Sequence, residues 1–138
     1  MKIAICGSMS FASEMRNVRN LLKKVGHFCY LPEGTNEHSK GKVKKIGGSE
    51  GAKRKIQKNL IRKHYRLIEK SDAILVINND KKGIKNYIGG NSFLEMGFAH
   101  ILGKKIYLMN EIPEEEIVKQ EIEAFQPIII NGDLNKIK

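Results

Sequence analysis

A single carboxylate, Glu95, stands in a segment that is otherwise built for burial. The run 91–102 (NSFLEMGFAHIL) carries no other acid, and Gly89 and Gly90 precede it. A carboxylate in such a helix needs a compensating partner, because taking a charge out of water is costly. In the first helical turn the helix dipole would keep Glu95 ionised, as a nucleophile must be. The two glycines would let a ligand approach the backbone closely.

The same residues permit a purely structural interpretation. Ser92 and Glu95 have the spacing of a capping box, in which the glutamate bonds back to a backbone N–H at the start of its own helix. The residue types alone leave both interpretations open.

A second candidate site is the short segment Gly7, Ser8, Met9 and Ser10, which joins an apolar run to a helical one. Free N–H groups at a helix start, helped by the dipole, favour an anion, and the two serines add hydroxyl donors. Ser10 could instead serve only as a helix cap. The segment matches neither the GxGxxG pattern nor the Walker A pattern, so by itself it is weak evidence for a nucleotide site.

Apolar runs of strand length alternate with segments of helical period. Strands are predicted at 2–6, 27–31, 72–78, 104–109 and 127–130, and helices at 11–25, 53–70, 91–102 and 113–124. This alternation predicts an α/β fold, a flavodoxin-like three-layer sandwich whose five-stranded parallel sheet has the order 2-1-3-4-5 and helices on both faces. Ligands of such sheets bind outside the carboxyl ends of the strands, near the first and third. The candidate segments should therefore converge there.

The composition is consistent with one domain over residues 1–138, in which 33–52, rich in Gly, Lys and Ser, forms a flexible basic loop. The net charge of +10 favours anionic partners, although a solvated lysine surface would explain it equally well. Cys6 and Cys29 lack metal-ligand spacing, so we expect reduced cysteines, no structural zinc and no cofactor. No run suggests a signal peptide or membrane span, which predicts a cytoplasmic protein without a membrane partner.

Three segments resemble the nucleoside 2-deoxyribosyltransferase superfamily, which includes the 2'-deoxynucleoside 5'-monophosphate N-glycosidases. They are Cys6-Gly7-Ser8, Ser71-Asp72 and the run 95–104 (EMGFAHILGK). The resemblance covers most of residues 1–109, and the last segment is the specific one. It implies a flavodoxin-like, commonly dimeric protein that cleaves or exchanges the base–sugar bond through that glutamate.

On this resemblance Glu95 is the nucleophile that attacks the anomeric carbon, where a carboxylate stabilises an oxocarbenium-like state. Members usually carry an aspartate that assists the leaving base at the position of His64. A histidine can also donate a proton near neutral pH, or His64 can be an ordinary residue on the apolar stripe of its helix. The expected substrate-binding residues are Gly7, Ser8, Met9, Ser10, Tyr87, Gly89, Gly90, Asn91 and Ser92, with Tyr87 either stacked on the base or merely at the surface.

Three functions follow in order of preference. The first is a nucleoside or nucleotide N-glycosidase or 2-deoxyribosyltransferase, acting on a 5'-monophosphate. The second is a non-catalytic nucleotide-binding module, and the third a nucleic-acid-binding protein using the basic stretch 40–58, which has no aromatic residues for stacking. A homodimer is expected because the acidic stretch 110–126 stands in a basic chain, although that stretch could be a solvated helix.

Overall fold

Within residues 1–41 and 48–138, which the computed structural model describes, five parallel strands form one sheet. The strands are β1 (Lys2–Gly7), β2 (Phe28–Tyr30), β3 (Ala73–Ile77), β4 (Lys105–Leu108) and β5 (Ile128–Ile129). Their order is β2-β1-β3-β4-β5, and each neighbouring pair is parallel. The predicted α/β class and strand order are confirmed.

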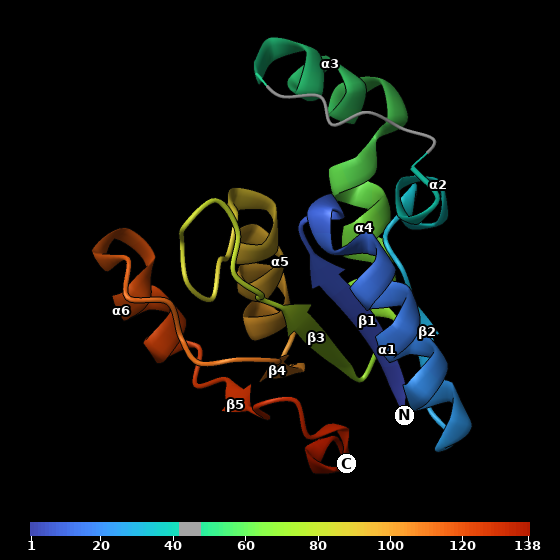
Figure 1. Cartoon of the computed structure of the whole chain (residues 1–138), viewed down its shortest axis with the longest axis vertical. Coiled ribbons are helices and arrows are strands. Elements are labelled where there is room, and N and C mark those ends of the chain that lie inside the picture. Colours follow the sequence, from blue (N-terminus) through green and yellow to red (C-terminus); the bar gives the residue numbers. More distant parts are fainter. Residues whose placement is uncertain (42–47) are drawn as a thin grey trace.

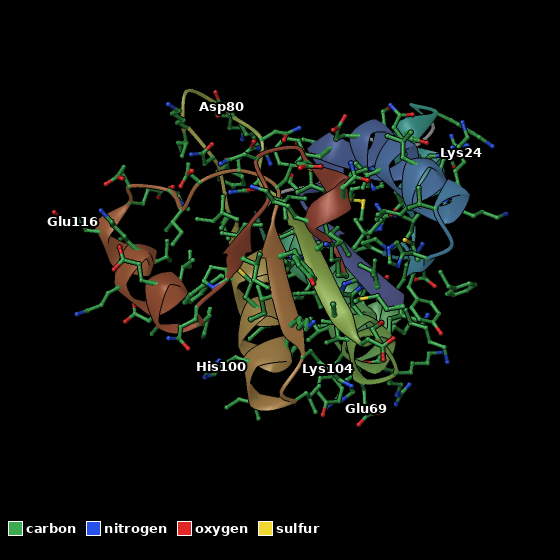
Figure 2. The ribbon with its side chains drawn as sticks, turned by 90° about the horizontal axis from the view of Figure 1, so that it is seen from below. Lys24, Glu69, Asp80, His100, Lys104 and Glu116 are labelled. Atoms are coloured by element: carbon green, nitrogen blue, oxygen red, sulfur yellow. The ribbon has the colours of Figure 1, made fainter. Side chains whose placement is uncertain are left out.

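Helices cover both faces of this sheet. One face packs against α1 (Ala12–Lys24) and the short 3-10 helix η2 (Leu134–Lys136), and the other against α4 (Leu60–Glu69), α5 (Gly90–Ile101) and α6 (Glu116–Ala124). Figure 2 shows Lys24, at the end of α1, on one side of the sheet and Glu69 and His100, in the last turns of α4 and α5, on the other. All of β3 is buried, which explains why its sequence is apolar without alternation.

The segment 33–52 differs from the predicted loop. It contains α2 (Thr35–Ser39) and the beginning of α3 (Gly48–Lys58). None of the residues of α3 is buried, so its sequence has no apolar period that could reveal a helix, although Glu, Ala, Lys and Arg are good helix formers. Residues 42–47, with three lysines of the basic stretch 40–58, lie outside the described residues.

The single helix predicted at 53–70 is also wrong, because Asn59 divides it. Asn59 has a φ of 52°, a left-handed conformation that asparagine tolerates better than most residues. Figure 1 shows α3 at an angle to α4, beyond the end of the sheet at which β1 finishes. The break therefore lets α3 lie near the carboxyl ends of the strands (Figure 1), where its Arg54 and Lys55 line a cavity.

Close packing fixes the strand ends at the point where the strand order reverses. A Cβ at Gly7 would lie 3.1 Å from the carbonyl oxygen of Ile77, so the end of β1 needs a glycine. The side-chain amide of Asn78 donates to the carbonyl oxygens of Asn110 (3.2 Å) and Glu111 (2.9 Å). The backbone N–H of Asn110 donates to the Asn78 Oδ1 at 2.8 Å, so the ends of β3 and β4 are tied together.

None of the helices in the described part of the chain is long and apolar enough to span a membrane.

Candidate functional site

A cavity of about 1080 Å³ lies at the carboxyl ends of β1 and β3. Loops and helix ends from α3, α4, α5 and the segment after β1 form its walls. It is lined by every candidate residue named from the sequence: Gly7, Ser8, Met9, Ser10, His64, Tyr87, Gly89, Gly90, Asn91, Ser92 and Glu95. Its size is that of a small-molecule site.

Glu95 and His64 meet inside this cavity, although they come from different helices. The Oε2 of Glu95 lies 2.8 Å from the Nε2 of His64, and the two side chains are only 13% and 8% exposed. A charge-assisted hydrogen bond of this kind compensates the burial of the carboxylate. Within the described chain Glu95 has no other hydrogen bond, so its second oxygen, Oε1, is available for chemistry.

The capping-box alternative is therefore wrong. Gly89 caps α5, and the carboxylate of Glu95 bonds a side chain of α4 rather than its own backbone. The expectation of a first-turn position is also wrong, because α5 begins at Gly90 and one turn takes 3.6 residues. The burial of Glu95 is thus compensated by a hydrogen bond from His64 and not by the helix dipole, which acts within the first turn.

Cys6 completes a compact group with this pair. Its Sγ lies 3.4 Å from the Nε2 of His64, and the residue is fully buried. Burial raises the pKa of the Cys6 thiol well above its usual value, and the nearby Glu95 carboxylate raises it further. The thiol therefore stays protonated near neutral pH. From the sequence we expected only a reduced cysteine at position 6 and did not place it beside His64, because nothing in the spacing reveals which helix faces it.

The other ring nitrogen of His64 has a different environment. Nδ1 is buried and has no hydrogen-bond partner among the residues that the structure describes. Both polar contacts of the imidazole are thus made through Nε2, toward Glu95 and Cys6. His64 lies on the buried side of α4, as one interpretation expected, and also faces the cavity.

The segment after β1 binds a lysine from a distant loop. The Oγ of Ser8 accepts hydrogen bonds from the Nζ of Lys81 (2.8 Å) and from the backbone N–H of Ser10 (3.3 Å). Ser8, and not Ser10, is therefore the cap of the short 3-10 helix η1 (Met9–Phe11). Lys81 reaches this position because it is paired with Ile84 across a tight turn. The sequence showed several lysines in this loop but not which one reaches Ser8.

Tyr87 forms another part of the wall. Its ring lies 4.9 Å from the Nζ of Lys81, within cation–π range, and its backbone N–H donates to the carbonyl of Asn79. A Cβ at Gly89 would lie 3.0 Å from the Tyr87 hydroxyl, whereas one at Gly90 would meet open space. Gly89 therefore makes room for the tyrosine, and Gly90 exposes the backbone toward the cavity.

Positive charge dominates the described lining of the cavity. Two carboxylates, Glu33 and Glu95, face seven cationic side chains: Arg54, Lys55, Lys63, Arg66, Lys70, Lys81 and Lys82. A concave surface with one dominant sign of charge concentrates ligands of the opposite sign. The arrangement favours an anionic ligand.

The comparisons with known proteins add a likeness of fold. No protein-family model and no curated protein matches the chain. Among solved structures, the chain is similar to a 2-deoxyribosyltransferase from the psychrotolerant bacterium Bacillus psychrosaccharolyticus. The two are 19% identical with a TM-score of 0.49, and the match covers 78% of this chain and 71% of that one. These values carry no argument about activity, which has to come from the side chains of the cavity.

The environments of the two cysteines predict different reactivity. The thiolate is the reactive form, and the pKa of Cys29 is raised to about 11 by its partial burial, while Cys6 is wholly inaccessible. With single-cysteine variants, we expect iodoacetamide at pH 8 to modify Cys6 (in Cys29→Ser) at least about tenfold more slowly than Cys29 (in Cys6→Ser). Modification of Cys29 should accelerate as the pH rises toward 11. Intact-protein mass spectrometry measures both rates, and equal rates would show that Cys6 is accessible.

Proposed function

We propose that this chain cleaves the base–sugar bond of a nucleoside or nucleotide, as an N-glycosidase or a 2-deoxyribosyltransferase, with Glu95 as its nucleophile. The observation that supports this most is the state of one carboxylate. His64 holds Oε2, while Oε1 has no hydrogen bond within the described chain, and both residues line a cavity large enough for a nucleotide. A carboxylate fixed by one oxygen is suited to attack through the other.

The proposed reaction balances with water or a second base as the acceptor. Oε1 of Glu95 bonds to the anomeric carbon while the carbon–nitrogen bond breaks, and the bond electrons leave with the base, which takes up a proton. The acceptor then attacks the same carbon and frees the carboxylate. We assign His64 the role of orienting Glu95 through Nε2, and because its Nδ1 is buried, the departing base takes its proton from water in the cavity.

The basic lining supports a 5'-phosphorylated substrate. Lys81 is held at Ser8 by a hydrogen bond of 2.8 Å, which brings a positive charge to the segment expected to bind the sugar or its phosphate. Phosphate oxygens form strong charge-assisted hydrogen bonds with lysine. Tyr87, beside Lys81, offers an aromatic face for the base.

One observation favours a second candidate, a nucleotide-binding module without turnover. The carboxylate of Glu95 already shares a short hydrogen bond with His64, and a carboxylate stabilised in this way is a weaker nucleophile. The basic cavity would bind a nucleotide equally well in such a protein.

We also propose that a second copy of the chain packs beside the cavity. An apolar groove next to it is lined by Tyr65, Gly90, Phe93, Leu94, Gly97, Phe98, Ile101, Leu102 and Phe125. Ile101 is 84% exposed, and Leu94 and Phe98 line both the groove and the cavity. Covering this apolar surface would be favourable and would close one side of the cavity.

Replacing Glu95 with Gln tests the central proposal, because Gln keeps the shape of the side chain and removes the attacking charge. Release of free base from a panel of nucleosides and 5'-monophosphates, with and without an acceptor base, is measured by chromatography. We expect Glu95→Gln to lower the rate on the order of 10³-fold or more. Glu33→Gln, at the other carboxylate of the same cavity, should change it little. Ligand-induced thermal stabilisation of wild type without base release would instead support the binding module.

The preference for a phosphate can be tested at Lys81. We expect Lys81→Met to raise KM for a 5'-monophosphate by about 10- to 150-fold, since a hydrogen bond to a charged group contributes about 1.5–3 kcal/mol, while KM for the nucleoside stays constant. Lys85→Met is the matched control, because Lys85 is exposed in the same loop and does not line the cavity. If wild type treats nucleoside and monophosphate alike, the phosphate assignment is wrong.

The proposed dimer is tested by placing a charge in the groove. Ile101→Lys should shift the protein from dimer to monomer in sedimentation equilibrium, because a buried unpaired charge opposes association. Ile117→Lys is the control: Ile117 is 89% exposed on α6 and lies outside the groove. A wild type that sediments as a monomer at every concentration contradicts the proposal.

A further inference from the structure

A thiol, an imidazole and a carboxylate from three separate elements meet beside the cavity, which His64 and Glu95 line and behind which Cys6 is buried. Cys6 belongs to β1, His64 to α4 and Glu95 to α5, and one ligand atom from each lies within 4.8 Å of the others. We propose that these three side chains bind a divalent transition-metal ion of the zinc class. This goes beyond the proposed function, which requires no metal and gives Cys6 no role.

The separations between the three side chains are close to those of a metal site. With zinc bonds of about 2.0 Å to nitrogen and oxygen and about 2.3 Å to sulfur, tetrahedral ligand atoms lie about 3.3 Å (N to O) and about 3.5 Å (N to S) apart. Here Nε2 of His64 lies 2.8 Å from Oε2 of Glu95 and 3.4 Å from Sγ of Cys6. The N-to-O separation has to widen by about 0.5 Å to admit the ion, while the N-to-S separation already fits.

The charge of the group also fits a divalent ion. A zinc ion with a thiolate, a neutral imidazole and a carboxylate sums to zero. The loaded site therefore carries no net charge, which suits its burial. The ring proton that stays on His64 lies on Nδ1, which has no partner in the described chain. Metal binding breaks the hydrogen bond between Nε2 of His64 and Glu95, whose contribution is small beside that of three bonds to the metal.

The donor set selects the class of ion. Thiolate and imidazole favour zinc and cobalt over magnesium and calcium, which take oxygen ligands. His64 and Glu95 line the cavity, so an ion can enter from it and keep a fourth position for water. Metal binding would occupy the carboxylate of Glu95, so zinc should inhibit base release. Only this last consequence depends on the proposed function.

Cobalt(II) absorption provides the test, because a thiolate bound to cobalt gives a near-ultraviolet charge-transfer band. Cobalt is titrated into reduced, chelator-treated protein without substrate. We expect a band that saturates at one equivalent, is displaced by zinc and disappears in Cys6→Ser and His64→Gln. Cys29→Ser, at the other cysteine, should keep it. Glu95→Gln should retain the band but weaken cobalt binding at least about tenfold, because it loses a charged ligand.

Several results would overturn the metal site. They are a wild type without the band, a band that does not saturate at one equivalent, or one lost in Cys29→Ser and kept in Cys6→Ser. Circular dichroism shows whether each variant is folded, and the wild-type and Cys29→Ser titrations decide the question even if Cys6→Ser unfolds. Cobalt absorption and base release are measured separately, so failure of the metal proposal leaves the glycosidase proposal standing, and the reverse.

Discussion

The hydrogen bond between His64 and Glu95 is the interaction on which the interior of the cavity depends. Glu95 is nearly buried, and within the described chain its carboxylate has this partner alone. Removing one member of a buried pair costs about 3–5 kcal/mol because the remaining charge is uncompensated, while replacing both by apolar groups is often neutral. A chain that needed only stability would do as well with two apolar residues here. This energetic argument supports the proposal that the pair belongs to a functional site.

The rest of the fold serves to bring these two side chains to the same place. Close packing of β1 against β3 at Gly7 and the amide network of Asn78 fix the strand ends, and α4 and α5 cover the same face of the sheet. Because the carboxyl ends of parallel strands share one edge, the loops after β1 and β3 must meet there. The loop after β3 then places Lys81 on Ser8, so the charged wall of the cavity is tied to the strand order.

The same physics explains which features the sequence predicts. The parallel α/β class followed from apolar runs without polar alternation between helical segments, and right-handed crossovers left few strand orders, among them the observed one. The shared edge brought all the candidate residues into one cavity. The helix α3 escaped prediction because it buries nothing, and the break at Asn59 because a left-handed residue leaves no pattern. The sequence indicated that the carboxylate of Glu95 needs a partner. The capping box offered one on the same helix, whereas the actual partner, His64, lies on α4. Which helix faces Cys6 is decided by packing alone.

The positive charge of the cavity lining affects whether Glu95 would meet a nucleotide or a metal ion. The proposed sugar chemistry and the proposed metal binding both need Glu95, so they would exclude each other at any moment. The seven cationic side chains of the described lining would attract the proposed nucleotide and repel a divalent ion at long range. The field would thus favour entry of the proposed substrate, whereas a metal would have to be held by short-range bonds to Cys6, His64 and Glu95. Screening by salt weakens the first effect and hardly touches the second, because contacts between buried groups are little screened. Rising ionic strength should therefore shift the competition for Glu95 from the nucleotide toward the metal.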